Sequence, residues 1–92
     1  MTQPVVTLYV SDWCPYCQRA KNLLIQKQLV FDEINVDDDA KFREQMTARS
    51  NRSTVPQIFI GDKHVGGCDD LFALDRSGEL DRLITGAGDE RG

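Results

Sequence analysis

The amino-acid sequence predicts a mixed α/β fold whose strands and helices follow the order β-α-β-α-β-β-α. Short runs of β-branched and aromatic residues alternate with segments of helical periodicity, and the last two strands are joined by a tight Gly-Asp turn. The first β-α-β unit is expected to be parallel and right-handed. We therefore expect a mixed four-stranded sheet with helices on both faces, formed as a single domain by residues 1–92.

The first strand and the first helix are predicted on either side of Cys14. Residues 5–10, VVTLYV, have the composition of a buried strand. The helix is expected to begin at Pro15, because the missing N–H of proline costs nothing at the first helical position. Its apolar residues recur on one face, at Cys17, Ala20, Leu23 and Leu24.

The middle of the chain predicts a second strand, a second helix and a hairpin. Residues 29–36 are expected to form the strand, and the three aspartates 37–39 can cap a helix that reaches about Arg49. Residues 55–60, VPQIFI, and residues 63–66, KHVG, predict the two strands of the hairpin.

The C-terminal part of the chain predicts a third helix followed by a tail. This helix is expected to begin at Asp69 or Asp70 and to run through Leu74. Residues 79–84 predict one or two further helical turns, and the residues from about 85 onward are expected to fray.

Charge and hydropathy exclude several kinds of partner. The net charge of −4 argues against non-specific binding to nucleic acid or to an anionic membrane. No segment approaches the about 20 apolar residues of a membrane span. The start of the chain lacks the pattern of a signal peptide, so we expect a cytoplasmic protein. In that compartment, three cysteines are more often reactive or metal-binding than structural.

The motif CPYC, residues 14–17, lies where the first strand gives way to the first helix. At that place the sulfur of Cys14 faces the unpaired N–H groups and the partial positive charge of the helix N-terminus, which stabilise a thiolate. Cys17 follows one helical turn later, within disulfide distance. We therefore expect Cys14 to attack a substrate disulfide and Cys17 to resolve the mixed disulfide.

This motif has two other interpretations. A structural disulfide is disfavoured, because a loop this short constrains the unfolded chain little. Zinc is the stronger rival, with four possible ligands in Cys14, Cys17, His64 and Cys68. However, His64 falls in a predicted strand, and Pro15 suits a helix start better than a zinc knuckle. A Cys-x-x-Cys beside a β-α-β pattern favours redox chemistry.

A second motif is the dipeptide Val55–Pro56. The residue before a proline is held in an extended conformation. A cis bond here would turn the backbone N–H and C=O of Val55 toward an extended substrate. Local evidence alone favours the trans form, since only about 5–6% of X–Pro bonds in folded proteins are cis.

A third motif is GGCDD, residues 66–70. The two glycines permit backbone conformations that other residues tolerate poorly. The N–H groups of the residues that follow open a helix and offer a site for a carboxylate. The alternative is a turn with an ordinary N-cap.

Together, CPYC, TVPQIFI (54–60) and GGCDDL (66–71) resemble the glutaredoxin family in order and spacing, over about Val5 to Ile84. Within that family the chain looks most like the small bacterial dithiol members. The resemblance implies a thioredoxin-like fold in which Pro56 is the cis-proline of the family.

The resemblance also implies a function, that of a glutathione-dependent oxidoreductase in electron transport and cell redox homeostasis. Cys14 and Cys17 would form the redox-active disulfide and reduce protein disulfides, and Cys14 alone would reduce protein–glutathione mixed disulfides. Possible protein partners include ribonucleotide reductase, and the protein is expected to be monomeric and without a metal. Glutathione would be bound by Tyr16, Arg43, Thr54, Val55, Pro56, Gly67, Cys68, Asp69 and Asp70.

Ser11 departs from the family pattern, because members usually have a lysine three residues before the first cysteine. Without it, we expect a less stabilised Cys14 thiolate and a weaker hold on the glycyl carboxylate of glutathione, unless Arg43, Arg49 or Arg52 compensates. Trp13 could form an apolar rim for a protein partner or pack beside the turn. His64 is expected to have no catalytic role. Cys68 is expected to pack quietly, with glutathionylation or oxidation as the alternative.

Two other functions remain compatible with these residues. A redoxin of the same fold could take its electrons from thioredoxin reductase. A binding module could hold an iron–sulfur cluster through the first cysteine and glutathione, although Pro15 stiffens the loop and makes this less suitable here.

Overall fold

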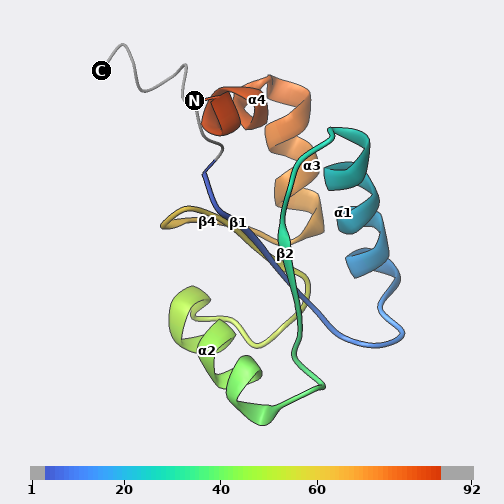
Figure 1. The fold of residues 1–92 in the computed structure, drawn as a ribbon, viewed down its shortest axis with the longest axis vertical. Coiled ribbons are helices and arrows are strands. Elements are labelled where there is room, and N and C mark those ends of the chain that lie inside the picture. Colours follow the sequence, from blue (N-terminus) through green and yellow to red (C-terminus); the bar gives the residue numbers. More distant parts are fainter. Residues whose placement is uncertain (1–3, 86–92) are drawn as a thin grey trace.

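The computed structural model describes residues 4–85 and contains a four-stranded sheet with helices on both faces (Figure 1). The elements are, in chain order, β1 (Val6–Val10), α1 (Pro15–Gln26), β2 (Asp32–Asn35), α2 (Ala40–Ser50), β3 (Gln57–Ile60), β4 (Lys63–Gly66), α3 (Cys68–Ser77) and α4 (Glu79–Thr85). The strand order in the sheet is β2-β1-β3-β4, with β1 parallel to β2 and the other two pairs antiparallel. The predicted mixed sheet and its parallel first unit are confirmed.

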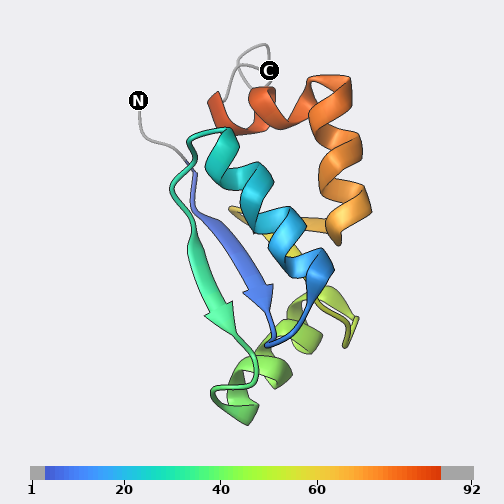
Figure 2. The ribbon, with the colours of Figure 1, turned by 90° about the vertical axis from the view of Figure 1, so that its right-hand side faces the viewer.

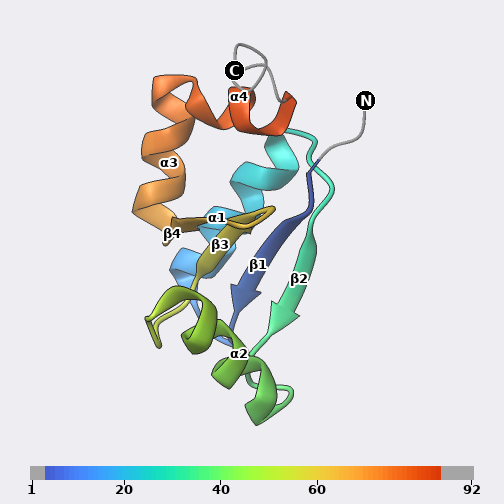
Figure 3. The same ribbon diagram turned by 90° about the vertical axis from the view of Figure 1, so that its left-hand side faces the viewer.

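The sheet divides the interior into two cores because successive side chains of a strand point to opposite faces. The first core lies under α1, α3 and α4, and its strand residues are Val6, Leu8, Val10, Ile58 and Ile60. The second core lies under α2 and consists of Tyr9, Val36, Met46 and Phe59. In Figure 2, α1 lies in front of the yellow hairpin of β3 and β4, and in the opposite view of Figure 3 this hairpin lies in front of α1.

The ends of several elements differ from the prediction. The second strand was expected over 29–36, but only Asp32–Asn35 form it, because Leu29 and Phe31 turn inward and pack against the first core. The third helix begins at Cys68, earlier than expected, since Gly67 takes the N-cap position. It also continues past Leu74 to Ser77.

The third strand begins at Gln57, later than expected, because the Val55–Pro56 bond is cis and turns the chain just before the strand. The local preference for trans is therefore wrong at this bond, and the expectation drawn from the family is confirmed. Thr85 is the last residue of α4, and the rest of the predicted tail lies outside the described residues. Within residues 4–85, no helix combines the length and the apolar character needed to cross a membrane.

Candidate functional site

Cys14 is the N-cap residue of α1, as its position between strand and helix predicted. Its backbone is extended, and its Sγ accepts a hydrogen bond from the backbone N–H of Cys17 at 3.1 Å. The same sulfur lies 4.0 Å from the carbonyl oxygen of Val55, the residue before the cis-proline. As the N-cap residue, Cys14 faces the N-terminus of the helix with its sulfur. Because it is only half-buried, the sulfur also remains accessible to a substrate.

Cys17 lies one turn deeper and is buried within the first core. Burial, followed by the hydrogen bond with Cys14, raises the pKa of the Cys17 thiol from 9.0 to about 12. Both cysteines are free thiols. The two sulfurs thus differ in the way that an attacking and a resolving thiol must differ.

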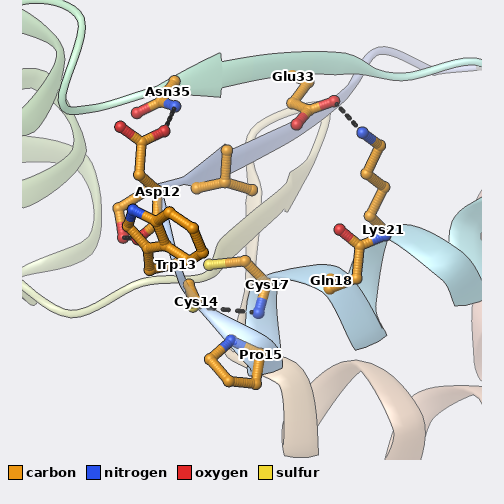
Figure 4. A pocket seen from close by; sticks show the side chains of 11 residues that line it. Asp12, Trp13, Cys14, Pro15, Cys17, Gln18, Lys21, Glu33 and Asn35 are labelled. Atoms are coloured by element: carbon orange, nitrogen blue, oxygen red, sulfur yellow. Dashed lines mark hydrogen bonds and ion pairs between the residues drawn. The ribbon is translucent and has the colours of Figure 1, made fainter.

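The segment before Cys14 is held by the connection between β2 and α2. The Asp12 N–H donates to Asp37 Oδ2 at 2.9 Å. Asn35 Nδ2 donates to Asp12 Oδ1 at 2.8 Å (Figure 4). The Asp37 N–H in turn donates to Asn35 Oδ1 at 2.8 Å. Sequence reasoning missed this brace, since its partners lie more than twenty residues apart and no local pattern marks them.

Trp13 has a left-handed backbone (φ 57°) and is 99% exposed. The alternative that Trp13 packs beside the turn is therefore wrong. The indole stands at the mouth of a hollow of about 460 Å³ between the active-site turn and β2, here called the Trp13 hollow (Figure 4). Its lining is Val10, Ser11, Asp12, Trp13, Cys14, Pro15, Cys17, Gln18, Lys21, Glu33 and Asn35.

A separate groove of about 260 Å³ lies beside the cis-proline and is here called the Pro56 groove. It is formed by three segments that are far apart in the sequence. Its lining is Tyr16, Arg52, Thr54, Val55, Pro56, Gln57, Gly67, Cys68, Asp69 and Asp70. This lining contains every residue predicted to bind glutathione except Arg43, and it adds Arg52 and Gln57.

Arg43 is held away from the Pro56 groove by two contacts. Its guanidinium donates to the Ser53 carbonyl at 2.9 Å and lies 3.7 Å from an Asp37 carboxylate oxygen. Arg49 is also engaged elsewhere, with its guanidinium 4.0 Å from the centre of the Phe59 ring. Within residues 4–85, the basic side chain in the lining of the groove is that of Arg52.

The N-terminus of α3 forms one end of the groove. The Gly67 N–H donates to Asp70 Oδ2 at 3.0 Å, and the Arg52 guanidinium lies 3.6 Å from the same oxygen. Gly66 has φ +119°, and a Cβ at this position would collide with the Asp70 carboxylate. Glycine is therefore required here both by its backbone conformation and by the close approach of Asp70.

His64 and Cys68 lie on opposite sides of the sheet. The His64 ring stacks on Phe59 of the second core, with ring centres 4.9 Å apart, whereas Cys68 belongs to the first core. The four candidate zinc ligands therefore do not converge, and residues 4–85 contain no group of three or more such side chains placed to hold a metal ion. Cys68 is 5% exposed, and this burial raises the pKa of its thiol. Both properties are those of an unreactive, packed thiol.

Comparison with known proteins gives consistent matches. A family model described as glutaredoxin matches residues 6–65. Glutaredoxin 3 of Escherichia coli (strain K12) is 54% identical over 79 residues, which cover 86% of this chain and 95% of the relative. The solution structure of glutaredoxin from Brucella melitensis is 49% identical, with a TM-score of 0.80 and 91% of each chain covered.

A crystal structure of a buckwheat glutaredoxin–glutathione complex is 30% identical to this chain. Its TM-score is 0.82, and the match covers 94% of this chain and 80% of the buckwheat chain. These structural matches confirm the thioredoxin-like fold.

The two buried thiols allow a test of the site's ionisation. Burial disfavours a charged sulfur and raises the pKa values of Cys17 and Cys68 above 9.0. Both thiols remain buried when Cys14 is replaced, so their pKa values should stay raised. We expect the ultraviolet absorbance of the Cys14→Ser variant to show no thiolate step below pH 9.0. A step below that pH would contradict the assignment, and adding Cys68→Ser would identify the thiol responsible.

Proposed function

The chain belongs to the glutaredoxin family, whose members are glutathione-dependent thiol–disulfide oxidoreductases, and we propose that Cys14 is its attacking thiol and Cys17 its resolving thiol. One observation carries this assignment. The Cys17 N–H donates to the sulfur of half-buried Cys14, while Cys17 itself is buried and protonated. A helix N-terminus directed at an accessible sulfur favours nucleophilic attack by that sulfur.

With a protein–glutathione mixed disulfide, Cys14 acts alone. Its thiolate attacks the glutathione sulfur, a Cys14–glutathione disulfide forms, and the protein leaves as a thiolate that takes a proton from water. A second glutathione thiolate then attacks the glutathione sulfur bound to Cys14. Glutathione disulfide is released, and the Cys14 thiolate is restored.

With a protein disulfide, both cysteines take part. Cys14 attacks one sulfur of the substrate, and the other sulfur leaves as a thiolate. Cys17 then gives its proton to that thiolate and attacks Cys14 Sγ. The substrate sulfur bound to Cys14 leaves as a thiolate that takes a proton from water, and a Cys14–Cys17 disulfide remains. Two glutathione molecules reduce that disulfide and become one glutathione disulfide.

The order of these two steps follows from the surroundings of Cys17. After burial, the hydrogen bond and the charge interaction with Cys14 contribute to its raised pKa. Once Cys14 is in a mixed disulfide, its sulfur carries no negative charge, so that part of the penalty disappears. The Cys17 thiol therefore becomes easier to ionise only after Cys14 has reacted, and it stays protonated until then.

The Pro56 groove is the proposed glutathione site, and its chemistry fits a tripeptide with two carboxylates and one ammonium group. The N-terminus of α3 suits the γ-glutamyl carboxylate, and the Asp69 carboxylate suits the ammonium group. The backbone of Thr54 and Val55 would pair with the cysteine residue of glutathione. The buckwheat complex supports glutathione as the ligand of this fold.

Arg52 is the proposed partner of the glycyl carboxylate. Ser11 brings no charge to the position of the usual lysine, and Arg43 is engaged with Ser53 and Asp37. The Arg52 guanidinium lies 3.6 Å from an Asp70 carboxylate oxygen, but the side chain is half-exposed in the lining of the groove, and its other N–H groups can donate to an incoming carboxylate. Arg52 would then offset the weaker binding of the glycyl carboxylate that we expect from Ser11.

The Trp13 hollow is the proposed contact surface for protein substrates. A fully exposed indole with a left-handed backbone is unfavourable both in hydration and in conformation, and such features are common at binding sites. Its substrates are cytoplasmic disulfide-bearing proteins, with ribonucleotide reductase as one candidate. The protein acts on them as a monomer.

Replacing each active-site cysteine by serine separates the two reactions. Cys17→Ser should retain reduction of a small glutathione mixed disulfide and lose reduction of protein disulfides, because only the second reaction needs a resolving thiol. Cys14→Ser should lose both. A glutathione reductase-coupled assay measures the first reaction, and a parallel assay with thioredoxin reductase identifies the electron donor. Activity of Cys14→Ser on the mixed disulfide would overturn the proposed roles.

Removing the charge of Arg52 should weaken substrate binding. We expect Arg52→Gln to raise KM for a glutathionylated peptide by about 3- to 10-fold with little change in kcat, as for loss of one partly exposed charged contact. The matched control is Arg76→Gln, which removes the same charge from the exposed last turn of α3. Equal KM values for the two variants would exclude Arg52 from the site.

Removing the Trp13 side chain should affect only protein substrates. Trp13→Ala is expected to lower kcat/KM for a disulfide-bearing protein by about 3- to 10-fold, a typical effect of an aromatic contact residue. Turnover of a small mixed disulfide should not change. Ile25→Ala, at a half-exposed position near the C-terminal end of α1, is the control. A similar loss with both variants would argue against a specific surface at Trp13.

A further inference from the structure

A buried amide stands directly behind the Pro56 groove. Gln57 is 1% exposed, and a buried polar side chain of this kind needs hydrogen-bond partners. Its Nε2 donates to the Thr54 carbonyl oxygen at 3.0 Å and lies 3.3 Å from Thr54 Oγ1. The amide therefore binds, from inside, the backbone of the loop that lines the groove.

His64 supplies the other partner of this amide. Its Nε2 lies 2.6 Å from Gln57 Oε1, and its ring is held by stacking on Phe59. Because the Gln57 nitrogen is already a donor to Thr54, the Gln57 oxygen is the acceptor here. Nε2 of His64 therefore carries the proton in this contact.

His64 is held as a neutral donor. Burial is the largest cause that lowers its pKa, and the cations Arg52 and Arg49 act in the same direction, while Asp70 opposes them. A neutral imidazole has one N–H, and Gln57 accepts it. The ring stacks on Phe59 of the second core, on the other side of the sheet from Cys17, so it does not exchange protons with the reacting sulfurs.

The hydrogen bond from Gln57 to the Thr54 carbonyl fixes the direction of the next N–H, that of Val55, because both groups belong to one planar peptide. In a trans peptide the C=O and the following N–H point in opposite directions. The bond between Thr54 and Val55 is trans, since the cis bond is the next one along the chain. When Gln57 binds the Thr54 carbonyl from inside, the Val55 N–H is directed away from Gln57.

The Val55 N–H has no acceptor among the protein groups of residues 4–85. The Val55 carbonyl lies 4.0 Å from Cys14 Sγ, so the residue that carries this donor lies beside the reacting sulfur. A donor with no partner in the lining of a groove requires water or a ligand. A hydrogen bond to the carbonyl of the same peptide also polarises its N–H and makes it a better donor.

We propose that His64 and Gln57 are positioning residues, which direct the Val55 N–H at the peptide backbone of bound glutathione through the series His64 Nε2–H to Gln57 Oε1 and Gln57 Nε2–H to Thr54 O. The proposal rests on the assignment of the Pro56 groove to glutathione. It gives His64, which was expected to have no catalytic role, a function at a distance from the reacting atoms.

Three variants separate positioning from packing. His64→Phe keeps a ring on Phe59 and removes the donor. His64→Gln places an amide N–H where Nε2 was and is the rescue variant. Gln57→Leu keeps the side-chain size and removes both contacts.

Two reactions of Cys14 serve as readouts. We expect His64→Phe and Gln57→Leu to raise KM for a glutathionylated peptide by about 3- to 10-fold, as for loss of one hydrogen bond. The single-turnover rate with 4,4′-dithiodipyridine, a disulfide without a peptide backbone, should stay at the parent value. His64→Gln should restore KM, and His64→Phe in the Gln57→Leu background should add little, because both residues act through one contact.

Three outcomes would overturn the proposal. They are a parent-like KM in His64→Phe, an equal loss in both reactions, and failure of His64→Gln to restore KM. An equal loss accompanied by a lower urea midpoint would mark a purely structural role. Failure of the glutathione assignment itself would look different, since the parent protein would then show no preference for the glutathionylated peptide over an unmodified peptide disulfide.

Discussion

The hydrogen bond from the Cys17 backbone N–H to the Cys14 sulfur, 3.1 Å long, is the contact on which the rest of the site depends. It forms because α1 begins at Pro15 and makes Cys14 the N-cap, so that a sulfur takes the place of the oxygen that usually accepts from the first turn. The same turn carries Cys17 into the first core, where burial keeps it protonated. One helix start thus produces an accessible thiol and a reserve thiol.

The two cores of the sheet have different parts in this arrangement. The first core holds Cys17 and Cys68 in an apolar setting. The second core is bordered by polar contacts, in which His64 and Gln57 support the loop before the cis-proline. Val55 packs against both cores and lies beside Cys14. The loop that faces the thiol is therefore supported from the side of the sheet opposite to it.

The sequence predicted the elements whose causes are local. The apolar periodicity after Pro15, the three aspartates before α2 and the turn between the hairpin strands each depend on neighbours a few residues away. The groove was predicted in a different way, from the resemblance of CPYC, TVP and GGCDD to a known family, because these segments lie far apart in the sequence and no local contact joins them. Arg43 and Arg52 show the limit of such reasoning. Both are basic and close to the TVP loop in sequence, but only packing decides that the first is engaged by Ser53 while the second lines the groove.

The sequence by itself determined the order of the elements, the place of Cys14 at a helix N-terminus and the chemistry of a dithiol. Only the tertiary structure decided that Trp13 stands fully exposed, that Asp12 is braced by Asp37 and that Gln57 joins His64 to the TVP loop. The physical reason is the separation, along the sequence, of the residues that make each contact. Capping, periodicity and turns are set by contacts within a few residues, whereas a side chain's exposure and its distant partners depend on which strands and loops the fold brings together.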